Sequence, residues 1–147
     1  MGFTPTGGIP MGTRSGDLDP GLLAYLARDL DLGAADLDHI VTSESGLLGM
    51  SATSSDMREL LAREAEDVRA KEAVAVFCYQ IKKCIGAYAA ALGGLDTLVF
   101  AGGIGEKAPA VRTRVCDGLS FLGIELDETQ NAANAKVVSR PAGRVLV

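Results

Sequence analysis

Apolar residues recur at helical spacing along most of the chain, and this pattern predicts a helix-rich fold. The first helix is expected to begin at Asp19 and Pro20. An aspartate caps free backbone N–H groups, and a proline at the first helical position loses no hydrogen bond. Four leucines follow at helical spacing: Leu22, Leu23, Leu26 and Leu30. This helix is expected to end near Gly33.

Two shorter helices are predicted next. One covers residues 36–43, and a loop follows over residues 44–54. The other is expected to be capped by Ser54 or Ser55, because a serine hydroxyl accepts a hydrogen bond from a free N–H group at a helix start. It is expected to end near Ala65.

The longest predicted helix covers Val68–Leu92, and Gly93 with Gly94 is expected to stop it. Its larger apolar side chains fall on one broad stripe, which is typical of a helix that packs against a core. They are Val74, Phe77, Cys78, Ile81, Ile85, Tyr88 and Leu92.

Strands and helices alternate in the last third of the predicted structure. Thr97 to Phe100 is a short, partly β-branched apolar run and is expected to be a buried strand. A helix is predicted over residues 106–122, a shorter one over residues 127–135, and strands over residues 136–139 and 144–147. The predicted class is therefore mixed α/β with helix dominant.

Composition narrows the function classes. The 147 residues, 48% of them hydrophobic and 22% charged, fit one domain with a real core rather than a disordered chain. The net charge of -5 makes a nucleic-acid partner unexpected, because such proteins need a cationic surface. A phosphate-bearing small molecule stays compatible, since backbone N–H groups and one or two arginines can bind it.

The sequence also indicates the compartment. A zinc site is not expected, because the three cysteines lack metal-type spacing and His39 is the single histidine. We expect the cysteines to be reduced thiols and His39 to have a structural role. No stretch of about eighteen apolar residues is present, so no membrane partner is expected. We expect a cytoplasmic protein.

Both ends of the chain look like cut edges. Residues 1–16 form a glycine-rich loop with no element before it, and residues 144–147 form an apolar, strand-like run with nothing after it. A buried strand is an unusual place for a domain to stop. We therefore expect a domain truncated at both ends.

The segment LVFAGGIGE, residues 98–106, runs from the predicted strand through glycines into a helix. Glycines let a ligand approach the backbone, and the free N–H groups of a helix start favour an anion. The segment fits a nucleotide-binding turn, but it is neither a P-loop nor a complete GxGxxG motif. An ordinary strand–helix connection explains the spacing equally well.

Two other segments could bind an anion. Arg14 lies in the loop GTRSGD, where a guanidinium with glycine neighbours can meet a phosphate or carboxylate, or can simply be solvated. Asp17 and Asp19 fit helix capping better than metal binding. Hydroxyls and an aspartate fill residues 51–56 ahead of Arg58, where helix capping is the simpler interpretation and an anion or ribose site the alternative.

Together and in this order, three stretches resemble the C-terminal half of acetate kinases, in the acetokinase family. They are MGFTPTGGIPMGTRSGDLDP, SGLLGMSATSSDMREL and VFAGGIGEKAPAVR, and the likeness runs through essentially all 147 residues, including FLGIELD. The GTRSGD and GGIGE blocks are highly specific in combination.

This resemblance implies a fold and an activity. Acetate kinases look like two-domain members of the sugar kinase/actin/Hsp70 group, with a ribonuclease H-like core, and the chain would be the C-terminal, nucleotide-binding lobe of this actin-like ATPase fold. They transfer the γ-phosphoryl group of ATP reversibly to acetate, giving acetyl phosphate and ADP, with magnesium. A propionate kinase is the alternative within the family.

The resemblance also implies roles for particular residues. Arg14 matches the family arginine that stabilises the transition state. The segment matched to the nucleotide lining is Asp56, Met57 and Arg58. The segment matched to the glycine turn that holds adenosine and phosphate groups is Gly103, Ile104, Gly105, Glu106 and Lys107.

The chain departs from the family pattern in two residues and in extent. Ala52 stands where glycine is usual, and Lys107 stands where asparagine is usual. The N-terminal domain, with the catalytic aspartate, a second arginine and a histidine, is not matched, and the family's magnesium-binding glutamate lies beyond Val147. We therefore expect no metal ligand in this chain and little activity in isolation.

Several partner hypotheses follow. The expected partners are the small molecules acetate and ATP, and a missing N-terminal domain or a homodimer partner. The alternative is a non-catalytic nucleotide-binding remnant, or one chain of a split kinase.

Overall fold

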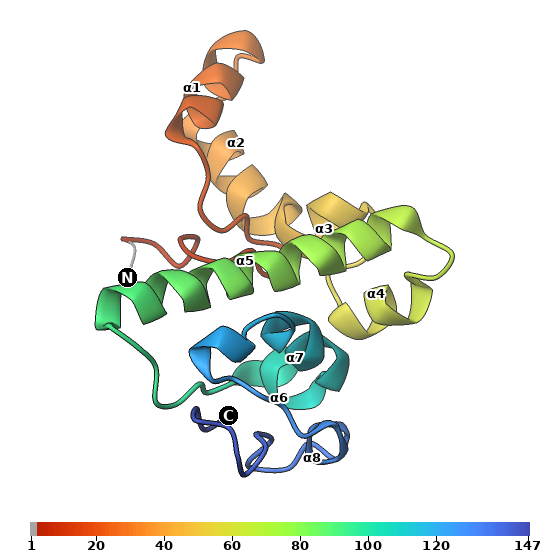
Figure 1. Ribbon diagram of the computed structural model, residues 1–147. Coiled ribbons are helices and arrows are strands. Elements are labelled where there is room, and N and C mark those ends of the chain that lie inside the picture. Colours follow the sequence, from red (N-terminus) through yellow and green to blue (C-terminus); the bar gives the residue numbers. More distant parts are fainter. Residues whose placement is uncertain (1–2) are drawn as a thin grey trace. The chain divides into compact units, whose positions relative to one another are not determined.

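A computed structural model describes residues 3–147. The chain divides into two compact units, Met1–Phe77 and Cys78–Val147, and each is described by itself. The long helix α5 (Val68–Leu92) belongs to both (Figure 1).

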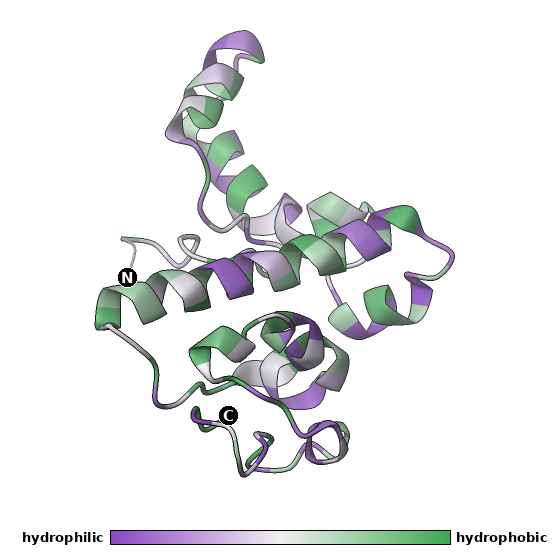
Figure 2. Ribbon diagram, viewed as in Figure 1, coloured by the Kyte–Doolittle hydropathy of each residue, from purple (hydrophilic) through white to green (hydrophobic). Residues whose placement is uncertain are grey.

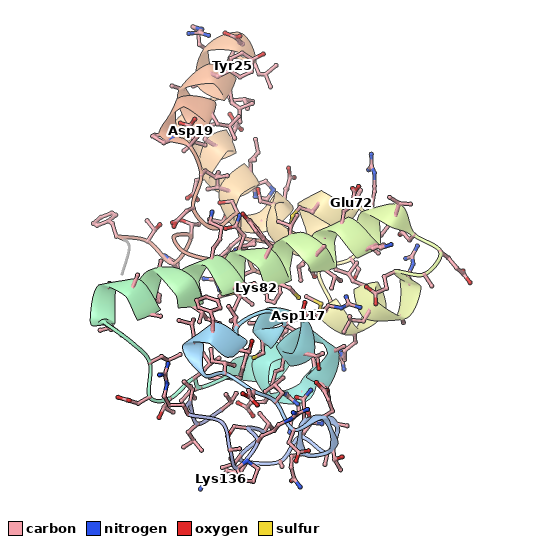
Figure 3. All side chains as sticks on the ribbon, in the orientation of Figure 1. Asp19, Tyr25, Glu72, Lys82, Asp117 and Lys136 are labelled. Carbon is pink, nitrogen blue, oxygen red and sulfur yellow. The ribbon has the colours of Figure 1, made fainter. Side chains whose placement is uncertain are left out.

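The first unit begins with a pair of short helices. α1 (Pro20–Asp29) starts as predicted, with the Asp19 carboxylate accepting a hydrogen bond from the N–H of Gly21 at 2.8 Å. It packs against α2 (Ala34–His39) (Figure 1). Figure 3 labels Asp19 at the start of α1 and Tyr25 within the helix, and Tyr25 is half exposed to solvent.

The segment after α2 is more helical than the sequence indicates. The predicted helix over residues 36–43 is present as α2 followed by the π-helical turn η1 (Ile40–Glu44). The predicted loop over residues 44–54 is wrong, because α3 (Gly46–Ser51) lies inside it. Backbone N–H groups at the start of α3 bind carbonyls of residues 11 and 12, distant contacts that local periodicity cannot reveal.

The next helix, α4 (Met57–Arg63), is shorter than predicted and begins later. Its N-cap is Asp56, whose side chain accepts from the N–H of Arg58 at 2.8 Å, so the prediction of Ser54 or Ser55 as cap is wrong. Ser54 acts one step earlier: its hydroxyl accepts from the N–H of Asp56 at 3.0 Å.

The limits of α5 are as predicted, but its apolar stripe is only partly buried. Figure 2 shows hydrophobic and hydrophilic stretches along this helix, and Figure 3 labels Glu72 and Lys82 on it. Side chains of the stripe that are buried are Val74, Phe77, Cys78 and Ile85. Tyr88 and Leu92 are 67% and 75% exposed, so the stripe does not continue into the last turns.

Short helices make up much of the second unit. They are α6 (Gly102–Lys107), α7 (Pro109–Cys116), the 3₁₀ turn η2 (Ser120–Leu122) and α8 (Glu128–Ala132), and α7 packs against both α6 and α8. The predicted continuous helix over residues 106–122 is wrong. Proline forces the preceding residue out of the helical region, and Ala108 has φ -116° and ψ 83° before Pro109. Gly118, with φ +73°, separates α7 from η2.

The segments predicted as strands form no regular strand in residues 3–147. In the described residues, Thr97 pairs with Leu146 and Leu126 with Ser139 only as isolated bridges. The segments still run side by side, with the N–H of Leu98 donating to the carbonyl of Leu146 at 2.8 Å. Val99 is 76% exposed, so the expectation of a buried strand at Thr97 to Phe100 is wrong.

The core of the second unit comes from α7 and from the non-helical segments that follow it. Its fully or nearly fully buried side chains include Val111, Val115, Ile124, Val138 and Val145. The predicted helix over residues 127–135 is confirmed in its centre as α8, capped by the Asp127 carboxylate. Burial raises the pKa of the Cys116 thiol to about 12.

Candidate functional site

The loop that carries Arg14 is fixed by backbone hydrogen bonds. The N–H of Met11 donates to the carbonyl of Arg14 at 3.0 Å and closes a turn. The N–H of Leu47 donates to the carbonyl of Met11 at 2.9 Å, and the N–H of Ser45 donates to that of Thr13 at 2.9 Å. The start of α3 therefore holds the turn from which the arginine projects.

Gly46 makes this close approach possible. Its φ is +61°, a region that favours glycine, and a Cβ at this position would lie 2.2 Å from the carbonyl oxygen of Met11. The same atom would lie 2.7 Å from the carbonyl oxygen of Arg14.

The Arg14 side chain is half-buried and only lightly engaged. Its Nη1 donates to the carbonyl of Pro5 at 2.9 Å. Within residues 3–147 it forms no ion pair with a carboxylate. Its positive charge is therefore not neutralised by a neighbouring acid in this unit.

The hydroxyl cluster ahead of α4 is a capping structure. The buried Ser51 hydroxyl donates to the carbonyl of Ser54 at 3.0 Å and accepts from the N–H of Ser54 at 3.1 Å. The Ser54 hydroxyl donates to Glu59 Oε2 at 2.5 Å. These groups hold the helix start, as the simpler sequence interpretation predicted.

Arg58 and Asp56 form an exposed ion pair at the start of α4. Arg58 Nη2 lies 2.5 Å from Asp56 Oδ2, and Nε donates to Asp56 Oδ1 at 3.1 Å. The side-chain hydrogen bond from Arg58 lowers the pKa of Asp56 to about 2 and raises the pKa of Arg58. Met57 between them is buried and anchors the helix.

This ion pair predicts an unusual acid titration. The native pKa of Asp56 is about 2 against an ordinary value of 3.8, so its contribution to stability is present above pH 3.8 and is lost as the pH falls through about 2. Carbon-detected NMR should place the midpoint near 2. Arg58→Gln should move it towards 3.8. An unchanged midpoint in that variant would contradict the assignment to the ion pair.

The structure brings the Arg14 loop and the start of α4 together. A Cβ on Gly12 would lie 3.2 Å from the carbonyl oxygen of Ser55, so the two backbones are in direct contact. Two of the three sequence-derived segments, those of Arg14 and of Asp56 to Arg58, therefore adjoin each other in the first unit.

The third segment, the glycine turn, lies in the second unit as α6. Gly102 has φ +74°, and a Cβ on Gly102 or Gly103 would meet nothing within 4 Å, so their backbone is open to an approaching group. Gly105 differs, because its Cβ would lie 3.2 Å from the carbonyl carbon of Phe100. Ile104 is half-buried, whereas Glu106 and Lys107 are exposed.

Sequence reasoning missed Arg112, which lies behind this turn. The residue is only 3% exposed, and its guanidinium donates to Asn131, Asn134 and the carbonyl of Gly105. Desolvation by burial lowers its pKa. The available signal was a cation between Val111 and Val115, two apolar positions of one helix.

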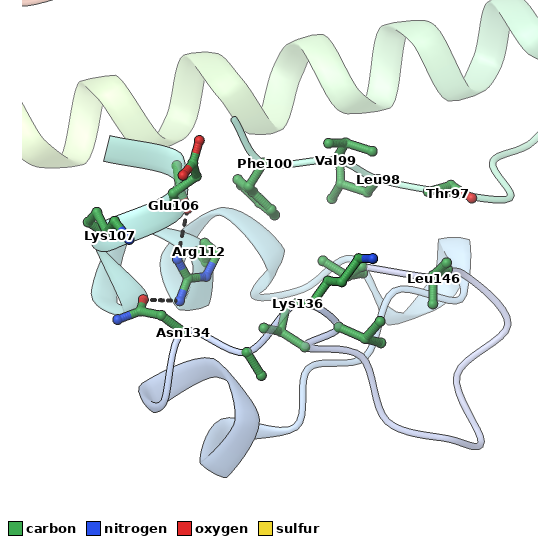
Figure 4. A pocket seen from close by; sticks show the side chains of 15 residues that line it. Thr97, Leu98, Val99, Phe100, Glu106, Lys107, Arg112, Asn134, Lys136 and Leu146 are labelled. Carbon is green, nitrogen blue, oxygen red and sulfur yellow. Dashed lines mark hydrogen bonds between the residues drawn. The ribbon is translucent and has the colours of Figure 1, made fainter. Parts of the chain in front are cut away.

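A pocket of about 360 Å³ opens beside the glycine turn, within the second unit. Figure 4 shows Thr97 to Phe100 along one side of it, with Lys136 and Leu146 on the other. Glu106, Lys107 and Arg112 contribute to the end nearest α6.

Residues 3–147 contain no group of three or more His, Cys, Asp or Glu side chains placed to hold a metal ion. Over the same residues, no helix has the length and apolar character needed to cross a membrane.

Comparisons with known proteins agree with one another. The sequence model of the Acetokinase family matches residues 1–147. The chain is 49% identical over 133 residues to an acetate kinase of Chloroherpeton thalassium, covering 89% of this chain and 32% of that protein. It is 46% identical over 147 residues to an acetate kinase of Methylocella silvestris, covering 100% and 36%.

Solved structures give the same result. The crystal structure of Porphyromonas gingivalis acetate kinase matches with a TM-score of 0.95 and 43% identity, over 100% of this chain and 38% of that one. A propionate kinase from Francisella tularensis matches with a TM-score of 0.92 and 34% identity, over 100% and 38%. These neighbours support a helix-rich α/β fold. The chain spans 32–38% of the length of these four relatives.

Proposed function

Because the chain belongs to the acetokinase family, we propose that it supplies the nucleotide-binding part of an acetate kinase, which transfers the γ-phosphoryl group of ATP reversibly to acetate. In fold terms it is the C-terminal, nucleotide-binding lobe of an actin-like ATPase. The observation that carries the proposal is the family match along the whole chain, which includes all three candidate segments.

Each segment has a chemical task in this proposal. Arg14 stabilises the transition state, in which negative charge spreads over the equatorial phosphoryl oxygens. Its fixed turn and lack of a carboxylate partner in residues 3–147 suit that task. The segment of Asp56, Met57 and Arg58 lines the nucleotide. The turn from Gly103 to Lys107, whose backbone is open at Gly103, receives adenosine and phosphate groups.

Magnesium, when bound, would neutralise charge on the nucleotide phosphates. The described residues do not offer a cluster that could hold the ion by themselves. In this proposal its ligands include the nucleotide phosphates and the magnesium-binding glutamate that the family resemblance places beyond Val147. The proposed setting is the cytoplasm, with acetate and ATP as small-molecule partners and an N-terminal domain or a second copy completing the site.

Propionate is the second candidate acceptor, because one solved neighbour is a propionate kinase. Comparing kcat/KM for acetate and propionate in the intact enzyme decides between them.

Calorimetry with ADP tests the proposed nucleotide site. Gly103→Val adds a side chain where the fold leaves open space, so the stability should hold while ADP affinity falls at least about tenfold, or about 1.4 kcal/mol. Arg58→Ala removes an exposed cation and should also weaken ADP binding.

Arg28→Ala is the matched control, because Arg28 also forms an exposed pair with a neighbouring aspartate, at 2.7 Å from Asp29. It should bind ADP like the unmodified chain. A folded chain that does not bind ADP would refute the nucleotide site, as would equal losses in Arg28→Ala and Arg58→Ala.

A further inference from the structure

Arg112 is a buried cation whose partners are neutral. In the described part of the chain it pairs with no carboxylate, and its four hydrogen bonds go to amide and carbonyl oxygens. Burying a charge without a counter-charge is costly unless strong hydrogen bonds compensate. The acceptors of these bonds therefore indicate which parts of the chain the guanidinium holds in place.

The bond to the glycine turn fills a gap left by proline. In a continuous helix the carbonyl of Gly105 would accept from the N–H of residue 109, but Pro109 has none. Arg112 Nη1 donates to that carbonyl at 2.7 Å (Figure 4). A side chain of α7 thus fixes a carbonyl at the end of α6 that has no hydrogen-bond partner within its own helix.

The other bonds anchor the guanidinium to α8 and the residues after it. Nε donates to Asn131 Oδ1 at 2.6 Å, and Nη2 donates to the Asn131 carbonyl and to Asn134 Oδ1, each at 2.8 Å. Asn131 is itself held, because its amide donates to Thr113 Oγ1 at 2.9 Å. A rigid planar fork can serve these separate acceptors together, which a lysine ammonium cannot.

We propose that Arg112 is the positioning residue of the glycine turn: by tying Gly105 to Asn131 and Asn134, it holds residues 103–107 in the shape that receives the nucleotide. The proposal rests on the nucleotide site proposed above. Arg112 acts through the turn and does not need to touch the ligand.

The decisive variant is Arg112→Lys, which keeps the charge and removes the fork. We expect at least about a tenfold loss of ADP affinity by calorimetry, or about 1.4 kcal/mol. Without nucleotide, amide hydrogen exchange should become faster at Gly105, Glu106 and Lys107. Arg140→Lys is the matched control, since Arg140 Nε donates to a single carbonyl, that of Leu126, at 3.1 Å. It should change neither quantity.

Asn134→Gly keeps the test open if Arg112→Lys fails to fold. Asn134 has φ +51°, which glycine adopts readily, so the variant removes one acceptor of the guanidinium without straining the backbone. It should also weaken ADP binding and make amide hydrogen exchange in the turn faster.

The outcomes separate positioning from general stability and from the nucleotide site. A merely structural role would lower the melting temperature but leave ADP affinity unchanged in the folded fraction. That result, or unchanged exchange in the turn, would overturn the proposal. If the unmodified chain binds no ADP but exchange in the turn still responds to Arg112→Lys, the nucleotide site fails and the hold on the turn stands.

Discussion

Gly46→Ala is expected to destabilise the first unit by about 3 kcal/mol or more. A left-handed backbone costs a non-glycine residue about 1–2 kcal/mol, and each backbone hydrogen bond lost costs about 1 kcal/mol. The new methyl group would lie 2.2 Å from the carbonyl oxygen of Met11, so the loop or α3 must move. The bond from the N–H of Leu47 to that carbonyl would then be broken. Urea denaturation measures the loss.

The same movement should displace Arg14, whose carbonyl oxygen would lie 2.7 Å from the new methyl group. Gly93→Ala is the matched control. Its φ of +76° carries a similar strain, but nothing lies within 4 Å of the added atom. We expect it to cost only about 1–2 kcal/mol. Equal losses in the two variants would show that backbone strain, not contact with the Arg14 loop, sets the cost.

Helices with strong local signals were predictable from the sequence. Asp19 and Pro20 open α1 because capping and a fixed proline φ are local properties of two adjacent residues. The limits of α5 were also predictable, since a long apolar period ending in Gly93 and Gly94 leaves little alternative.

Elements that depend on distant partners were not predictable. α3 has only 6 residues, too few to show a helical period, and the carbonyls of Met11 and Gly12 accept hydrogen bonds from its first N–H groups. Thr97 to Phe100 has the composition of a strand, but a strand also requires a paired segment, and of these residues only Thr97 forms a bridge, to Leu146.

The residues of the candidate site fall into the same two groups: those that local sequence predicts and those that depend on distant partners. Arg14, Arg58 and the glycine turn could be located from local composition, because glycines and isolated cations stand out in a sequence. The contacts of Arg112 could not, since its partners Asn131 and Asn134 are 19 and 22 residues away; Pro109 marks a helix end without a donor, but it does not identify the side chain that replaces it.

The 147 residues assayed alone are expected to form acetyl phosphate at less than about one-thousandth of the rate of a full-length relative. Phosphoryl transfer depends on positioning and on neutralising charge, and well-placed groups together supply many orders of magnitude. The chain spans 32–38% of the length of the four relatives described above, and its described residues offer no cluster that could hold a metal ion. In the isolated chain, Arg14 would therefore act without the groups that orient both substrates.

A hydroxamate assay for acetyl phosphate measures this rate, and the same assay on Arg14→Ala is the control. Residual product that survives Arg14→Ala would come from another source, whereas product that disappears would show that Arg14 acts even in the isolated chain. Turnover near that of a full-length relative would contradict the prediction. ADP binding without turnover would instead show that nucleotide binding resides in these residues and that catalysis requires groups beyond them.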